Sequence, residues 1–170
     1  MRLMVVTIAL SLTQAASAQG SKPAQGCSAT ASPSPELAGW SRDAPLSVAG
    51  TAAGAAAPLT VGRAARLRLT RTPSVRYILP PKKQGEPGGN GGLASFTVAR
   101  AGTYRVALGS AAWVDVVRDG KAMSSVGHGH GPACSGIRKL VDFRLEPGRH
   151  LLQLAGGADP IATVLVVALP

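Results

Sequence analysis

Hydrophobic and polar residues alternate with period two through most of the chain after residue 64. In ARLRLT (65–70), two leucines fall on one face of an extended chain and two arginines fall on the other. In ASFTVARAGTYRVAL (94–108), the large apolar residues occupy every second position on both sides of RAG. This pattern predicts β-strands with one buried face, and no segment has a strong helical period.

Turn signals separate these strands at short intervals. We expect one hairpin over 94–108 that turns at RAG, a second over 111–123 that turns at Asp119-Gly120, and a third over 136–154 that turns at EPG. VRYIL (75–79) continues the extended pattern up to Pro80-Pro81, and DPIATVLVVALP (159–170) reads as a strand buried on both sides. Eight or nine short strands predict an all-β fold, an antiparallel β-sandwich or jelly roll.

The start of the chain has a different pattern. Arg2, an apolar run from Leu3 to Leu12 and the small residues Ala16-Ser17-Ala18 predict a signal peptide over 1–18. Residues 19–44 are rich in Ser, Pro, Ala and Gly and predict a flexible leader, with Trp40 packed on the domain that follows over 45–170. We therefore expect a periplasmic or secreted protein with no transmembrane span after cleavage.

Export changes the interpretation of the two cysteines, Cys27 and Cys134. An oxidising compartment favours a disulfide between them. The alternative is that Cys134 stays reduced and binds a metal.

The net charge of +10 predicts association with anionic partners. Charged residues are dispersed and only 4% of residues are aromatic, which does not fit a specific nucleic-acid module. No nucleophile elbow or triad order frames a serine, so we assign no catalytic residues.

VGHGHGPACSG (126–136) is the best candidate for metal chemistry. In an extended segment, His128 and His130 project to the same side, which suits two imidazoles on one ion. The third ligand would be His150, a reduced Cys134, or the carboxylate of Asp142 or Glu146. Iron, copper or zinc fits such a set. The alternative is an exposed Gly-rich connection with Cys134 in a disulfide.

A binding surface is the other candidate. Trp113 and Asp115 share one strand face, and a tryptophan beside charged residues can stack on a sugar ring or anchor a protein. Arg105, Arg138 and Arg144 occupy outward positions on neighbouring segments and complete the predicted ligand-binding set, near Asp142. Lys139 falls on a face predicted to point inward, so it either reaches out to water or pairs with one of the two aspartates.

Two stretches resemble known proteins. FTVARAGTYRVALGSAAWVDVVRDGKAM followed by FRLEPGRHLLQL is similar to secreted jelly rolls of the protective-antigen type and to related carbohydrate-binding modules, over about the last 80 residues. This resemblance implies a β-sandwich that binds glycans. The calcium-binding acidic residues of the sugar-binding members are replaced here by GSAA (109–112).

GTYRVALGSAAWVDVV and HGHGPACSGIRK together resemble short exported bacterial proteins that carry the name homogentisate 1,2-dioxygenase. That resemblance implies a non-haem iron site built on His128 and His130. The glutamate that follows a ligand histidine in the longer members of that family has no counterpart here.

These observations lead to two functional hypotheses. The first is an exported, non-catalytic module that binds an anionic envelope component, a glycan or a protein. The second is a small metal-binding protein or dioxygenase-like enzyme that uses the HGHGPAC loop.

Overall fold

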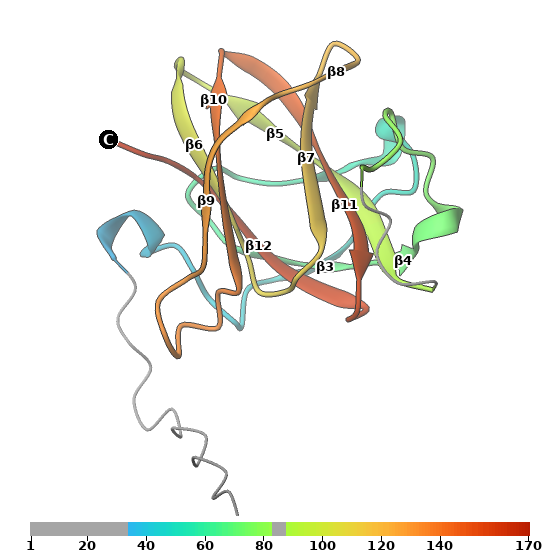
Figure 1. Ribbon diagram of the computed structural model, residues 1–170, viewed down its shortest axis with the longest axis horizontal. Helices are drawn as coiled ribbons and strands as arrows, with labels where there is room; N and C mark the ends of the chain where they lie inside the picture. The colour runs from blue at the N-terminus through green and yellow to red at the C-terminus, as the bar shows by residue number, and fades with distance from the viewer. Residues whose placement is uncertain (1–33, 83–87) are drawn as a thin grey trace, which may run out of the picture.

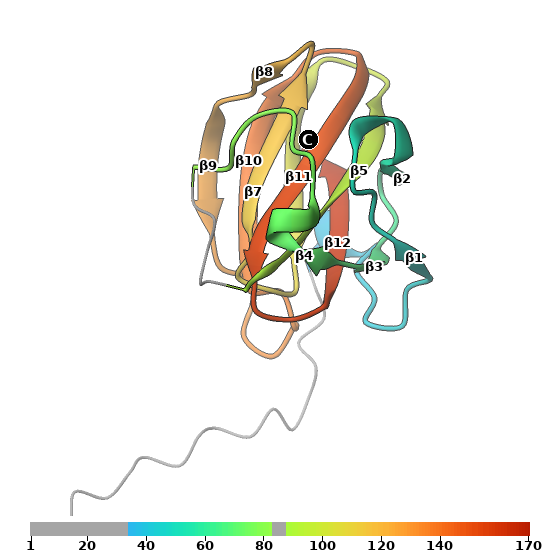
Figure 2. The same cartoon turned by 90° about the vertical axis from the view of Figure 1, so that its right-hand side faces the viewer.

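The computed structural model describes residues 34–82 and 88–170, and these form two packed β-sheets (Figures 1 and 2). The predicted signal peptide, the leader up to residue 33 and Cys27 lie outside the described residues. The all-β prediction is confirmed. The described residues contain 12 strands, more than the eight or nine expected, because the count includes short strands of two to five residues.

The first sheet, sheet A, has the strand order β1-β3-β12-β6-β10-β9. Its strands are β1 (Leu46–Val48), β3 (Ala65–Arg68), β12 (Ile161–Ala168), β6 (Gly102–Leu108), β10 (Lys139–Leu145) and β9 (Ser125–Gly129). All pairs are antiparallel except β1 with β3.

The second sheet, sheet B, has the order β2-β5-β11-β7-β8, with β4 also paired to β5. Its strands are β2 (Ala57–Pro58), β5 (Asn90–Val98), β11 (Gly148–Gly157), β7 (Trp113–Arg118), β8 (Lys121–Ala122) and β4 (Thr70–Arg71). The described residues also form three short 3-10 helices: η1 (Pro35–Leu37), η2 (Ala53–Ala55) and η3 (Thr72–Ser74).

Two of the three predicted hairpins are wrong in their pairing. Strands β5 and β6 belong to different sheets, and so do β10 and β11, so the turns at RAG and EPG are arches between sheets. The inward positions are nevertheless correct, because strands on opposite sheets also point one face into the shared core. The Tyr104 hydroxyl donates to the carbonyl of Arg100, 2.9 Å away, and fixes the first arch.

The hairpin at Asp119-Gly120 is confirmed, with Val117 paired to Ala122. Asp119 and Gly120 both have positive φ, 49° and 73°, which is the conformation that a tight two-residue turn between twisted strands requires. This hairpin is short, because β8 extends for only two residues.

The core lies between the sheets and contains Phe96, Val116, Phe143, Leu152 and Val164 among other buried residues. A second, smaller cluster lies on the outer face of sheet A, where the segment around η1 covers β12 and β6. It consists of buried Leu37, Ala107, Ile137 and Leu165, with Trp40 packed against them. This cover explains why β12 is apolar on both faces.

The segment VRYIL is not a strand. Residues 75–79 cross the outer face of sheet B over β11 and β7 (Figure 2). The backbone N–H groups of Val75 and Arg76 donate to the carbonyls of Thr72 and Thr51, and side chains hold the rest of the segment on the sheet. The Tyr77 hydroxyl donates to the carbonyl of Leu154 at 2.8 Å, and the amide side chain of Gln153 binds residues 78 and 79.

Candidate binding site

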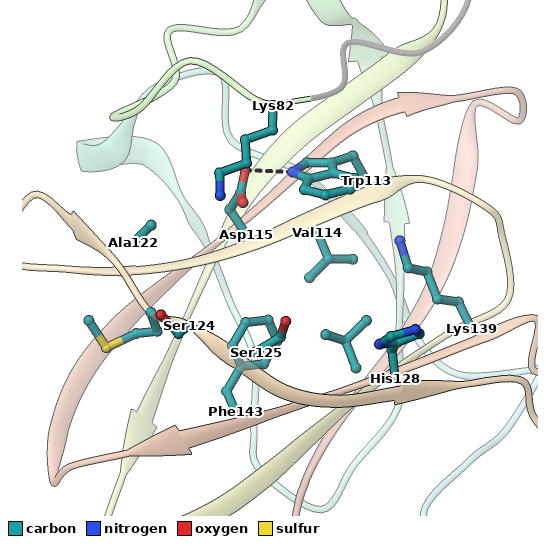
Figure 3. Close-up of a pocket in the computed structure, with 12 residues that line it drawn as sticks. Lys82, Trp113, Val114, Asp115, Ala122, Ser124, Ser125, His128, Lys139 and Phe143 are labelled. Atoms are coloured by element: carbon teal, nitrogen blue, oxygen red, sulfur yellow. Dashed lines mark hydrogen bonds between the residues drawn. The ribbon is translucent and has the colours of Figure 1, made fainter.

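A cavity of about 640 Å³ opens at one side of the sandwich, between β7 of sheet B and β9 and β10 of sheet A (Figure 3). Val114, Val141 and Phe143 give it an apolar floor. Its polar side chains come from Lys82, Trp113, Asp115, Ser124, Ser125, His128 and Lys139. This volume and this mixture of groups are typical of small-ligand sites.

Strand β7 borders the cavity because β8 is too short to cover it. Strand β8 pairs only with Val117 and Arg118, and the Trp113–Asp115 end of β7 lines the cavity. Alternation places Val114 on the core side, while Trp113 and Asp115 share the other face. The indole Nε1 of Trp113 donates to Oδ2 of Asp115 at 2.9 Å, so the two predicted ligand-binding residues form one unit.

Lys139 reaches the same place from sheet A. It shares the inward face of β10 with buried Val141 and Phe143, as predicted, and its side chain extends toward β7. Its Nζ donates to the carbonyl of Ala112 at 3.1 Å and lies 5.3 Å from the centroid of the Trp113 ring. A cation at this distance stabilises the position of the indole.

A β-bulge in β9 brings Ser125 and His128 onto one face. Residues three apart in a regular strand point to opposite sides. Here the register with β10 shifts, so that Ser125 pairs with Phe143 and His128 pairs with Val141. Both partners point inward, and both β9 side chains therefore line the cavity, while Val126 is 57% exposed. Bulges commonly redirect side chains in this way at functional sites.

Lys82 was not predicted as a site residue. It lies at the cavity because the side chain of Gln153 binds the segment just before it. Gln153 is 1% exposed, lies opposite Asp115 in the sheet and accepts from the backbone N–H groups of Ile78 and Leu79 at 2.7 and 3.3 Å. Its Nε2 donates to the carbonyl of Leu79 at 3.1 Å. The available sequence signal is a single amide inside the apolar strand HLLQLAG.

The charge on Asp115 depends on these neighbours. Burial raises the pKa of the Asp115 carboxyl, while the hydrogen bond from Trp113 and the ammonium groups of Lys82 and Lys139 oppose the rise. Burial therefore disfavours the charged form of Asp115, and the Trp113 hydrogen bond and the two ammonium groups offset part of this effect.

The three predicted arginines lie elsewhere. Arg105 is on the outer face of sheet A, where its Nε and Nη2 bind the two carboxylate oxygens of Asp142 at 2.7 and 2.8 Å. Glu36 lies 3.7 Å from its Nη1. Arg138 and Arg144 are exposed and do not line the cavity. The structure therefore separates the three predicted arginines from Trp113 and Asp115.

The three predicted metal ligands are not brought together. His128 lines the cavity, and the Nδ1 of exposed His130 lies 3.0 Å from the carbonyl of Arg138. His150 is 1% exposed, lies inside the sandwich and stacks on Phe96 with ring centroids 5.6 Å apart. Within residues 34–82 and 88–170, no group of three or more His, Cys, Asp or Glu side chains is arranged to hold a metal ion.

The loop that contains Cys134 contacts the segment near the N-terminus. The Trp40 Nε1 donates to the carbonyl of Ser135 at 3.1 Å, and Arg42 donates to the carbonyl of Cys134 at 3.4 Å. The described part of the chain contains no free cysteine. Because Cys27 lies outside it, the disulfide between Cys27 and Cys134 stays a prediction.

Comparison with models of known protein families gives no match, and no curated protein matches the sequence significantly. In the part of the chain that the structure describes, none of the helices has the length and hydrophobicity needed to cross a bilayer.

Proposed function

We propose that this protein is an exported, non-catalytic binding module, and that its ligand is a glycan of the cell envelope bound in the cavity beside Trp113. The observation that carries this proposal is the Trp113–Asp115 pair, held by a hydrogen bond at the border of a 640 Å³ cavity with an apolar floor. Sugar rings present C–H faces and hydroxyls together, and a tryptophan beside polar side chains can contact both.

The neighbouring side chains support a glycan over a purely apolar ligand. Ser124, Ser125 and His128 line one side of the cavity and supply hydroxyl and imidazole groups for hydrogen bonds to sugar hydroxyls. Val114 and Phe143 supply apolar contact below them. None of these contacts requires a chemical step, which is the reason we assign binding and not catalysis.

The test is binding of the full chain to an array of neutral and acidic oligosaccharides. Trp113→Ala should lose most of the signal, and Asp115→Asn should lose most of the signal from neutral oligosaccharides. Trp40→Phe and Asp159→Asn, which change the same residue types away from the cavity, should keep it. Equal binding by all four variants, or no binding by the unaltered chain, would contradict the proposal.

A further inference from the structure

The side chains of the cavity carry more potential positive charge than negative charge. Lys82, Lys139 and His128 line it, and Asp115 is the one acidic residue among the described lining residues. The carboxylate of Asp115 already accepts a hydrogen bond from Trp113, and both lysines act on it electrostatically. Two ammonium groups thus face one carboxylate in a partly buried site.

The two lysines approach from different parts of the fold. Lys82 follows the segment that Gln153 binds on the outer face of sheet B, and Lys139 comes from the inward face of β10. Figure 3 shows Lys82 beside Asp115 and the amine of Lys139 directed toward the Trp113 ring. An anion bound in the cavity would therefore lie near positive charge from two separate parts of the fold.

The charged groups of the cavity differ in exposure, because Lys139 and Asp115 are half-buried whereas Lys82 and His128 are exposed. Burial by the surrounding residues is the largest influence on the pKa of Asp115, so water is partly excluded around it. Charged hydrogen bonds gain strength in such an environment, whereas dispersed surface charges are screened by salt.

We propose that the cavity selects carboxylated glycans, whose sugar units are uronic acids, over neutral glycans of the same shape. This inference rests on the proposed function and names its ligand class. The ring and hydroxyls of the sugar contact Trp113 and the Ser125–His128 side, and the ligand carboxylate is recognised by the ammonium groups of Lys82 and Lys139.

The experiment compares short oligogalacturonates with their fully methyl-esterified forms, which differ in charge and keep the sugar backbone. Calorimetric titration of the full chain should give an affinity at least about tenfold higher for the acid, the value of one charged hydrogen bond. Lys82→Gln should reduce this ratio to about threefold or less. Lys121→Gln, an exposed lysine on β8 outside the cavity lining, should leave it unchanged.

Lys139→Arg and Lys139→Gln form a second pair. Because Lys139 also contacts Ala112 and Trp113, its removal can lower stability, and thermal unfolding of each variant is measured alongside binding. The charge-conserving Lys139→Arg should keep the preference for the acid, and Lys139→Gln should lose it.

The outcomes separate the two proposals. Equal affinity for acid and ester overturns the charge selection and leaves glycan binding intact. A preference for the acid that survives both Lys82→Gln and Lys139→Gln also overturns the inference, because the charge then acts from another surface. Binding of neither form overturns the proposed function together with the inference.

Discussion

The two tryptophans, Trp40 and Trp113, are both half-buried, but different residues surround them. Trp40 packs on the outer face of sheet A against a small apolar cluster, and its Nε1 donates to a backbone carbonyl, that of Ser135. Trp113 lies at the edge of sheet B, where its Nε1 donates to the carboxylate of Asp115 and Lys139 lies over its ring. Aliphatic neighbours and a backbone acceptor indicate a structural role for Trp40, whereas the charged side chains at the cavity are the basis of the binding role proposed for Trp113.

The largest expected effect concerns the region of Trp40. If Cys27 and Cys134 are joined, the intact mass before reduction should be lower by two hydrogens. Cys27→Ala should destabilise the fold by up to about 4–5 kcal/mol on the chain-entropy model. Mass spectrometry and denaturant unfolding measure both effects. Two alkylatable thiols in the native protein would show that the disulfide is absent.

Replacing each tryptophan by alanine tests directly whether the two side chains have different roles. Trp40→Ala should cost about 2–4 kcal/mol of stability, because it opens a space beside Leu37 and Leu165 and leaves the Ser135 carbonyl without its donor. Trp113→Ala should cost about 1 kcal/mol and abolish glycan binding. Denaturant unfolding and the oligosaccharide titration measure the two effects. A larger stability loss at Trp113 than at Trp40 would reverse the assignment of roles.

Alternation along the sequence predicts which residues are buried but not which strands pair. Phe96 and Val98, and Tyr104 and Val106 after the turn, are all buried as expected. A hairpin and an arch between two sheets place these residues on the same inward faces, so the local pattern cannot distinguish the two connections. Pairing across the whole sheet decides between them, and that information is not local.

Only part of the binding site could be predicted, again because a sequence pattern carries local information alone. Trp113 and Asp115 share a face by simple alternation, and the unusual inward position of Lys139 is visible in the sequence. The contributions of Ser125 and His128 depend on a bulge, and that of Lys82 depends on the side chain of a distant Gln153. A bulge changes the period locally, and the contacts of Gln153 with residues 74 and 75 positions away leave no periodic signal.

A smaller effect is expected from His150 inside the core. Burial lowers the pKa of its imidazole, Arg118 lowers it further, and the Gly148 carbonyl and Asp119 oppose these effects. His150 therefore binds a proton more readily in the unfolded chain than in the folded protein. Stability should fall as the pH drops from about 6.5 toward the folded-state pKa, by up to about 1.4 kcal/mol per pH unit.

His150→Leu should flatten this part of the pH profile, measured by denaturant unfolding from pH 7.5 to 4.5. Asp115 acts with the opposite sign, because its raised pKa favours the fold in acid, so Asp115→Asn serves to separate the two contributions. An unchanged slope in His150→Leu would show that other groups cause the pH dependence.

The smallest effect is expected from the HGHG segment. Both His128 and His130 are exposed, so changing both to alanine should alter stability by less than about 1 kcal/mol. The metal content of the untagged protein, measured before and after the change, tests the metal hypothesis. Stoichiometric iron, copper or zinc that disappears in the double variant would favour that hypothesis over the binding module.

The most direct test of the binding site uses the two indole N–H resonances in one NMR spectrum, assigned with Trp40→Phe. Titration with oligogalacturonate should shift or broaden the Trp113 resonance with saturation and leave that of Trp40 in place. Saturable binding that shifts Trp40 alone, or neither indole, would contradict the assignment of the cavity as the binding site.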